Sequence, residues 1–111
     1  MIEPYIEEAN FEESGFAYSL SLISGKYKMT ILYCLARFAP VRFNQIGRYL
    51  KIISDKTLST NLKELEADGL VARIDYDENP PHVEYDLTEL GKSLMEVLDQ
   101  LCYWGEDHKP M

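Results

Sequence analysis

The pattern of hydrophobic and polar positions divides this chain into five predicted helices and two predicted strands. The helices are expected over residues 16–23, 26–38, 43–50, 54–68 and 89–106, and the strands over residues 70–76 and 82–87. Gly25, Pro40 and Gly69 follow helices, where glycine supplies a left-handed stop and proline pushes the preceding residue out of helical geometry. In the second helix, apolar residues recur at helical spacing and predict a buried stripe of Met29, Leu32, Leu35 and Ala36.

The helix expected from Ser54 to Asp68 is amphipathic. Ser54 can cap it, because a serine oxygen accepts from the free backbone N–H groups of the first turn. Leucines at i, i+4 and i+7 predict one buried side: Leu58, Leu62 and Leu65. The opposite side carries lysine and hydroxyl groups: Lys56, Thr60 and Lys63, flanked by Thr57, Ser59 and Glu64.

Two short alternating segments follow this helix and enclose a turn that contains Pro80 and Pro81. Thr88 then opens the last helix as a second predicted N-cap. A helix with lysines and hydroxyls on its free face, followed by a hairpin and another helix, is the order found in winged helix-turn-helix proteins that bind DNA. We therefore expect an α+β fold, mainly α, with a winged helix-turn-helix and a small antiparallel wing.

The last helix has more apolar surface than one small domain needs. A stripe that wide belongs either to a large core or to contact with another chain, and in 111 residues contact is the better explanation. The residues expected at an interface with another chain are Leu94, Leu98, Leu101, Cys102 and Trp104. Residues 1–13 are expected to form an acidic arm, residues 14–105 the domain, and residues 106–111 a short tail.

Charge is distributed unevenly along the chain. The net charge is −8, yet residues 26–73 carry nine basic residues against four acidic ones, whereas residues 1–25 carry five acids and no base. Residues 74–111 carry ten acids and two lysines. A basic middle between acidic ends is expected when one face of a module meets a phosphate backbone, although single charges are also explained as solvated surface.

The bulk composition excludes several classes of protein. With 46% hydrophobic and 12% aromatic residues the chain can bury a core, and it has no apolar run of the roughly 20 residues that span a bilayer. The acidic N-terminus lacks a signal pattern, and two distant cysteines suit a reducing cytoplasm. No phosphate-binding loop, nucleophile–base pair or metal-ligand spacing is present, so neither an enzyme nor a cofactor or metal is expected.

Four separated motifs resemble the HxlR-type winged helix-turn-helix regulators of bacteria and archaea, which are similar in shape to the MarR group. The motifs are ISGKYKMTIL (residues 23–32), VRFNQI (41–46), ISDKTLSTNLKELEADGLVAR (53–73) and PPHVEYDLTELGKSL (80–94), followed by the pair Trp104-Gly105. They occur in family order and cover most of residues 14–105. The resemblance implies a homodimer joined through terminal helices, which binds a two-fold-related operator and acts as a transcriptional regulator.

By position in the family, the helix from Ser54 to Asp68 would enter the major groove and the wing would lie beside the backbone. The residues implied to face DNA are Lys56, Thr57, Ser59, Thr60 and Lys63, with Arg42 and Lys26 holding phosphate. Asn79 and His82 are the corresponding wing residues. Double-stranded DNA and a second copy of the chain are the expected partners, with no membrane.

The chain departs from the family at two places. Several members sense oxidants through a cysteine before the first core helix, followed by proline, but Ser14 and Gly15 stand here, and a serine cannot form a disulfide. The wing is acidic where the family has basic residues, with His82 as its candidate cation, so we expect a weak wing contact with DNA, slightly stronger when His82 is protonated.

Two alternatives remain open at this stage. The acidic wing and negative net charge are also compatible with a winged-helix module that binds another protein and DNA only weakly. Cys102, on the predicted dimer helix, could serve as a thiol sensor, although packing at an interface is favoured. Cys34 lies within a core helix and is expected to be a buried, inert thiol.

Overall fold

The computed structural model describes residues 5–111 and confirms the five predicted α-helices and the antiparallel pair of strands. The helices are α1 (Gly15–Ile23), α2 (Lys28–Phe38), α3 (Phe43–Leu50), α4 (Asp55–Ala67) and α5 (Glu89–His108). The strands are β1 (Val71–Asp75) and β2 (Val83–Leu87), and two 3-10 turns, η1 (Ile6–Glu8) and η2 (Phe11–Glu13), precede α1. The first four residues of the predicted acidic arm lie outside the described residues.

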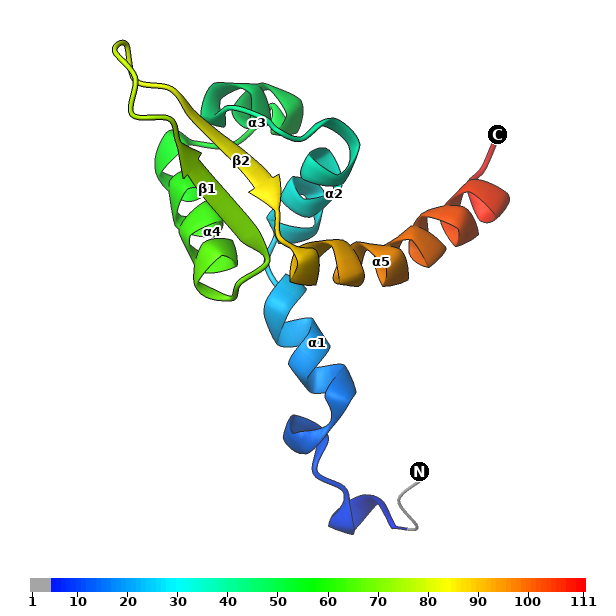
Figure 1. The fold of residues 1–111 in the computed structure, drawn as a ribbon. Coiled ribbons are helices and arrows are strands. Elements are labelled where there is room, and N and C mark those ends of the chain that lie inside the picture. The colour runs from blue at the N-terminus through cyan, green and yellow to red at the C-terminus, as the bar shows by residue number, and fades with distance from the viewer. Residues whose placement is uncertain (1–4) are drawn as a thin grey trace.

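A single core lies where α2, α3 and α4 meet the hairpin, and these elements form the body of the molecule (Figure 1). All three leucines predicted on the buried side of α4 belong to it. The side chains with less than 2% exposure are Ile31, Leu32, Cys34, Leu35, Ile46, Leu58, Leu62, Leu65 and Leu70. The leucine spacing in the sequence thus gave the correct buried side of α4.

The helix starts are set by local hydrogen bonds, as the sequence predicted. Ser54 Oγ accepts from the Thr57 backbone N–H at 3.1 Å, and Thr88 Oγ1 accepts from that of Gly91 at 3.0 Å. Each cap satisfies one of the N–H groups that a helix leaves free in its first turn. Gly69, with φ of 79°, lies just beyond α4 and lets the chain enter β1 directly.

The hairpin pairs β1 with β2 in one antiparallel register, from Val71 opposite Leu87 to Asp75 opposite Val83. Because side chains alternate along a strand, Val71, Arg73 and Asp75 share one face of β1. On that face Val71 is buried in the core, whereas Arg73 and Asp75, nearer the turn, are exposed. A short extended segment also precedes α3, since Val41 forms a β-bridge with Tyr85.

The predicted buried stripe of α2 was wrong in part. Met29 is 41% exposed and Ala36 is exposed, whereas Ile31 and Cys34 are buried beside Leu32 and Leu35. Most of this helix is apolar, so its periodicity does not select one face, and packing against α3 and α5 decides it. The helix also begins at Lys28, two residues after the predicted start.

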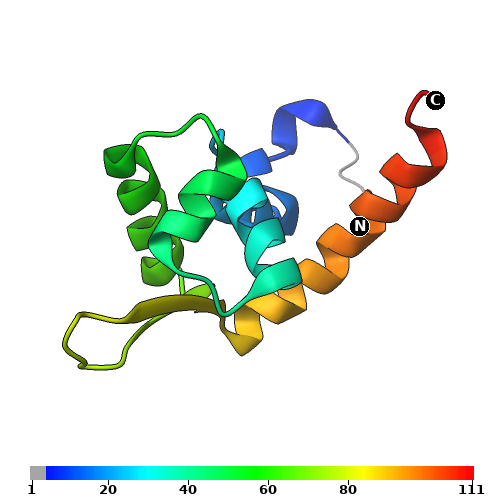
Figure 2. The same cartoon turned by 90° about the horizontal axis from the view of Figure 1, so that it is seen from above.

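Two helices leave the body in different directions. Figure 1 shows α1 and the C-terminal half of α5 extending from it, and Figure 2 shows the same part of α5 projecting in a second view. The radius of gyration is 16.7 Å, compared with about 13 Å for a compact chain of this length. No helix within residues 5–111 is long and apolar enough to cross a membrane.

Candidate nucleic-acid interface

The outward side of α4 presents the side chains that the sequence placed there. Lys56, Thr60 and Lys63 are exposed, while Ser59 is half-buried. The Leu58 side of the same helix is in the core. The helix therefore offers two ammonium groups and hydroxyls to a partner, a set that can bind phosphates and base edges.

Thr57 has a different environment from the other predicted contact residues. It is half-buried, and its Oγ1 accepts a hydrogen bond from Ser54 Oγ at 3.0 Å. Its backbone carbonyl also accepts from Asn61 Nδ2 at 2.8 Å. Thr57 thus contributes to the first turn of α4 and is less available to a ligand than Thr60.

Two contacts fix α4 and its preceding turn against α2. Lys28 Nζ lies 3.1 Å from Glu64 Oε2, and the Lys28 side chain is only 12% exposed. The Tyr27 hydroxyl donates to the Ile52 carbonyl at 3.3 Å, in the turn between α3 and α4. Neither contact was predicted from the sequence, because each joins residues at least 25 positions apart.

The two upstream basic residues lie at helix starts. Arg42 is exposed at the N-cap of α3, where its backbone N–H donates to Gln45 Oε1 at 2.9 Å. Lys26 is exposed just before α2, with its ammonium 5.4 Å from the centre of the Tyr27 ring. Since Tyr27 contacts the α3–α4 turn, Lys26 belongs to the side of the body where that turn lies.

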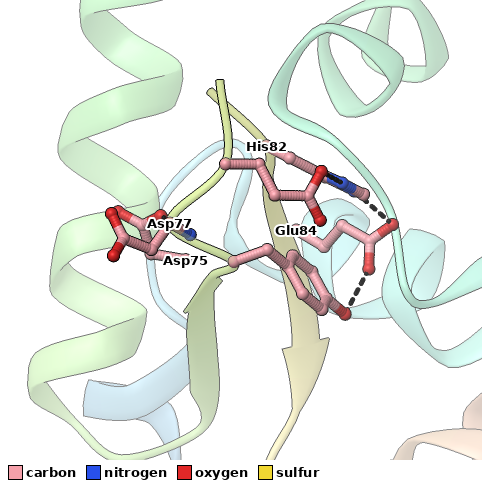
Figure 3. A network of polar contacts seen from close by, with 6 residues as sticks. Asp75, Asp77, His82 and Glu84 are labelled. Atoms are coloured by element: carbon pink, nitrogen blue, oxygen red, sulfur yellow. Dashed lines mark hydrogen bonds and ion pairs between the residues drawn. The ribbon is translucent and has the colours of Figure 1, made fainter. Parts of the chain in front are cut away.

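The wing holds a network of polar contacts around His82 (Figure 3). His82 Nε2 lies 3.1 Å from Glu84 Oε2, and His82 Nδ1 lies 3.4 Å from Glu78 Oε2. The Tyr76 hydroxyl donates to Glu84 Oε1 at 2.7 Å, and its ring lies 4.6 Å from the imidazole. Asn79, the other predicted wing contact, is exposed in the turn.

This network changes the acidity of Glu84 and Tyr76. The Tyr76 hydroxyl, and then His82, lower the pKa of the Glu84 carboxyl, because both stabilise the charged carboxylate. The Glu84 carboxylate in turn raises the pKa of Tyr76. Both nitrogens of His82 face carboxylates, those of Glu78 and Glu84, so the imidazole is engaged within the wing and offers little to a phosphate.

A groove of about 430 Å³ lies between α4 and the hairpin, beside the start of α3. Its lining residues are Phe43, Ser59, Lys63, Glu66, Arg73, Val83 and Tyr85. Arg73 was not among the predicted contact residues. No local sequence signal marked it, because the apolar residues of this strand alternate at Leu70, Ala72, Ile74 and Tyr76 and leave Arg73 on the polar side, as expected for any exposed arginine.

The residues predicted at a dimer interface lie along α5, outside the body for most of their length. Leu101 is 58% exposed and Trp104 is 62% exposed, whereas Leu94, Leu98 and Cys102 are half-buried. A mainly apolar groove of about 210 Å³ separates this helix from α2. It is lined by Met29, Thr30, Tyr33, Met95, Leu98, Leu101 and Cys102.

The two cysteines lie in different environments and both are free thiols. Cys34 is 1% exposed, and its burial raises the pKa of the thiol, which agrees with the prediction of an inert core residue. Cys102 lines the groove between α2 and α5. Ser14, at the position of the family's sensing cysteine, caps α1 by accepting from the Ala17 backbone N–H at 3.0 Å.

Comparisons with known proteins give a consistent result. The profile of the HxlR-like helix-turn-helix family matches residues 22–111. An uncharacterised HTH-type transcriptional regulator of Halalkalibacterium halodurans is 51% identical over 96 residues, which cover 86% of this chain and 85% of that protein. Three further proteins are similar: an uncharacterised HTH-type transcriptional regulator of Methanothermobacter thermautotrophicus, YtcD of Bacillus subtilis and the redox regulator HypR.

The archaeal protein is 45% identical over 84 residues, which cover 76% of this chain and 63% of that protein. The crystal structure of the regulator YtcD superposes with a TM-score of 0.80 at 42% identity, covering 86% of this chain and 96% of that one. HypR in its oxidised form also gives a TM-score of 0.80, at 37% identity, covering 88% of this chain and all of that one. The similarity thus extends over most of the described structure.

Proposed function

Because the chain belongs to the family of HxlR-like helix-turn-helix transcriptional regulators, we propose that it binds a two-fold-related operator as a homodimer. In this proposal α4 enters the major groove of each half-site. Lys56, Thr60 and Lys63 contact the DNA from α4, with Ser59 and Thr57 at its flanks. Arg42 and Lys26 hold phosphates from the starts of α3 and α2.

The observation that carries the DNA-binding proposal is the side of α4 that remains free. A helix whose apolar side is completely used by the core still presents two lysines and a threonine to solvent. Lys28 and the Tyr27 hydroxyl fix the position of that helix, so its exposed side chains form a pre-arranged set. Pre-arranged donors lose little conformational entropy when they bind, which favours specific recognition.

The homodimer is supported by apolar side chains outside the body. On α1, Phe16 is 66% and Tyr18 is 64% exposed, and α1 buries none of its nine residues. On α5, Val97 is 66% exposed next to Leu101 and Trp104. Exposed apolar surface on two projecting helices is expected at an interface between copies of the chain, and would be buried there.

A charge in the middle of the exposed stripe tests the homodimer. Leu101→Glu should convert the dimer to a monomer in sedimentation equilibrium, because an unpaired carboxylate would be buried between two apolar helices. Gln100→Glu adds the same charge to the neighbouring exposed position and should leave the dimer intact. If wild-type protein sedimented as a monomer at micromolar concentration, the homodimer would be wrong.

Selection from a random DNA pool separates this function from the alternative of a protein-interaction module. Wild-type protein should enrich a sequence with two inverted half-sites about 34–36 Å apart, centre to centre, or a multiple of one helical turn. Recovery of no preferred sequence would favour the interaction module, whose motivation is the acidic wing.

A further inference from the structure

The groove between α4 and the hairpin is continuous with the proposed DNA-binding side of α4. Ser59 and Lys63 line it from the helix, and Arg73 lines it from β1. Two cations and a hydroxyl therefore line one space, and Glu66 is the one carboxylate among its lining residues. That balance of charge suits an anionic occupant such as a phosphate group.

The tip of the wing is poorly suited to the same occupant. Its turn carries Asp77 and Glu78, and the side chain of His82 lies between Glu78 and Glu84. Asp75, the last residue of β1, accepts from the Asp77 backbone N–H at 2.9 Å through its Oδ1, and this hydrogen bond holds the start of the turn in place (Figure 3). A phosphate near this tip would meet an excess of negative charge, so it would be repelled.

Arg73 is the one arginine or lysine in the sequence from Leu70 to Leu87, which contains the hairpin. Its Nη1 lies 3.8 Å from Asp75 Oδ2, with the two side chains 45% and 56% exposed. An exposed ion pair at this distance contributes little, so it does not hold the guanidinium in place. A phosphate can accept two parallel hydrogen bonds from the guanidinium and would compete well for it.

We propose that Arg73 and Lys63 bind a backbone phosphate of the operator in the groove between α4 and β1, with Ser59 as a further donor. The wing would thus contact DNA through its stem, which is the paired strands β1 and β2, and not through the turn at its tip. This inference rests on the proposed function, and it adds Arg73 to the residues that contact DNA. It also assigns the acidic tip a different role, since the tip keeps the backbone away from the turn and directs it toward the stem. The occupant is thus a phosphodiester of the same duplex whose bases α4 reads.

The test is the salt dependence of binding to a duplex selected by the wild-type protein, measured by fluorescence anisotropy. Arg73→Gln should bind more weakly, and the slope of log affinity against log salt should become less steep by about 2, because each subunit loses one phosphate contact worth about 0.9. Arg73→Lys, which keeps the charge, should restore the slope. His82→Gln, at the tip, should keep the wild-type slope.

The outcomes separate the inference from the function on which it rests. If wild-type protein binds the duplex and Arg73→Gln retains its affinity and slope, the stem contact is wrong and α4 recognition stands. A loss of slope in His82→Gln equal to that in Arg73→Gln would also overturn it, by placing the contact at the tip. If the wild-type protein selects no duplex, both the function and the inference fail. Thermal unfolding of each variant shows that the fold is retained.

Discussion

At the scale of single residues, α5 can start where it does because Gly91 has no side chain. A Cβ at this position would overlap the carbonyl oxygen of Leu70 and lie 3.3 Å from Leu87 Cδ2. The Leu70 carbonyl is backbone and also accepts from the Thr88 backbone N–H at 3.1 Å, so it cannot move aside without breaking the junction between sheet and helix. Gly91 thus allows the start of α5, the proposed dimer helix, to pack directly against the backbone of Leu70, which precedes β1.

Gly91→Ala should therefore destabilise the protein by about 1–3 kcal/mol, the usual cost of overpacking a filled site. Gly47→Ala is the matched control, since its Cβ would meet only Leu58 Cδ2, at an ordinary contact distance of 3.6 Å. Thermal unfolding at one fixed protein concentration measures both variants, because the stability of a dimer depends on concentration. Equal midpoints for the two variants would contradict the overlap at Gly91.

Single residues also show what the sequence could establish. Ser54 and Thr88 were predicted as caps because a capping hydrogen bond joins residues three positions apart, and both caps are present. Arg73 was missed because its significance depends on Lys63, ten positions away, facing the same groove. Local chemistry is readable from the sequence, whereas a shared cavity requires the fold.

At the scale of elements, the wing is an internally paired hairpin. Tyr76 and His82 lie on its two sides and both contact Glu84, so the hairpin closes through side chains as well as through its backbone register. A carboxylate that accepts from both strands favours the folded hairpin over an open one. The wing tip is therefore shaped by its own charges and does not require DNA to define it.

The acidity of Glu84 gives a prediction for this element. The pKa of Glu84 is lower in the folded protein than in the unfolded chain, so the unfolded chain takes up a proton first as the pH falls. The ionised carboxylate therefore stabilises the fold fully above the Glu84 pKa of the unfolded chain. This stabilisation is lost as the pH falls through the Glu84 pKa of the folded protein. NMR titration should find the Glu84 pKa below the ordinary value of about 4.3. Tyr76→Phe removes the main cause and should raise it.

Glu84→Gln provides the corresponding stability measurement. This variant cannot lose the stabilisation that depends on an ionised carboxylate, so its melting temperature should fall less than that of the wild type between pH 6 and pH 3. An ordinary Glu84 pKa in the wild-type protein, unaffected by Tyr76→Phe, would show that the contacts of the wing do not act on this carboxylate.

Among the elements, α4 and the hairpin were better predicted than α2. The leucines of α4 recur at helical spacing among polar residues and define one side, whereas eight of the eleven residues of α2 are apolar and more than one face is suitable for burial. Packing against α3 and α5 selected the face with Ile31 and Cys34 in place of Met29 and Ala36. That choice depends on contacts between elements and is absent from the local pattern.

At the scale of the whole molecule, the chain has a compact body and two extensions with different chemistry. The body presents lysines and hydroxyls on α4, whereas α1 and the end of α5 present aromatic and aliphatic side chains. The basic middle of the sequence coincides with the body, and the acidic ends coincide with the extensions and the wing. A net charge of −8 is thus compatible with DNA binding by one face.

The central claim is that the free side of α4 binds DNA, and charge reversal at Lys56 tests it most directly. On a duplex selected by the wild-type protein, Lys56→Glu should weaken binding at least tenfold in an anisotropy titration, since each subunit of the proposed dimer loses about 1 kcal/mol of attraction. Lys109→Glu makes the same change just beyond the far end of α5 and should bind as the wild type does. Unchanged affinity for Lys56→Glu would contradict the account.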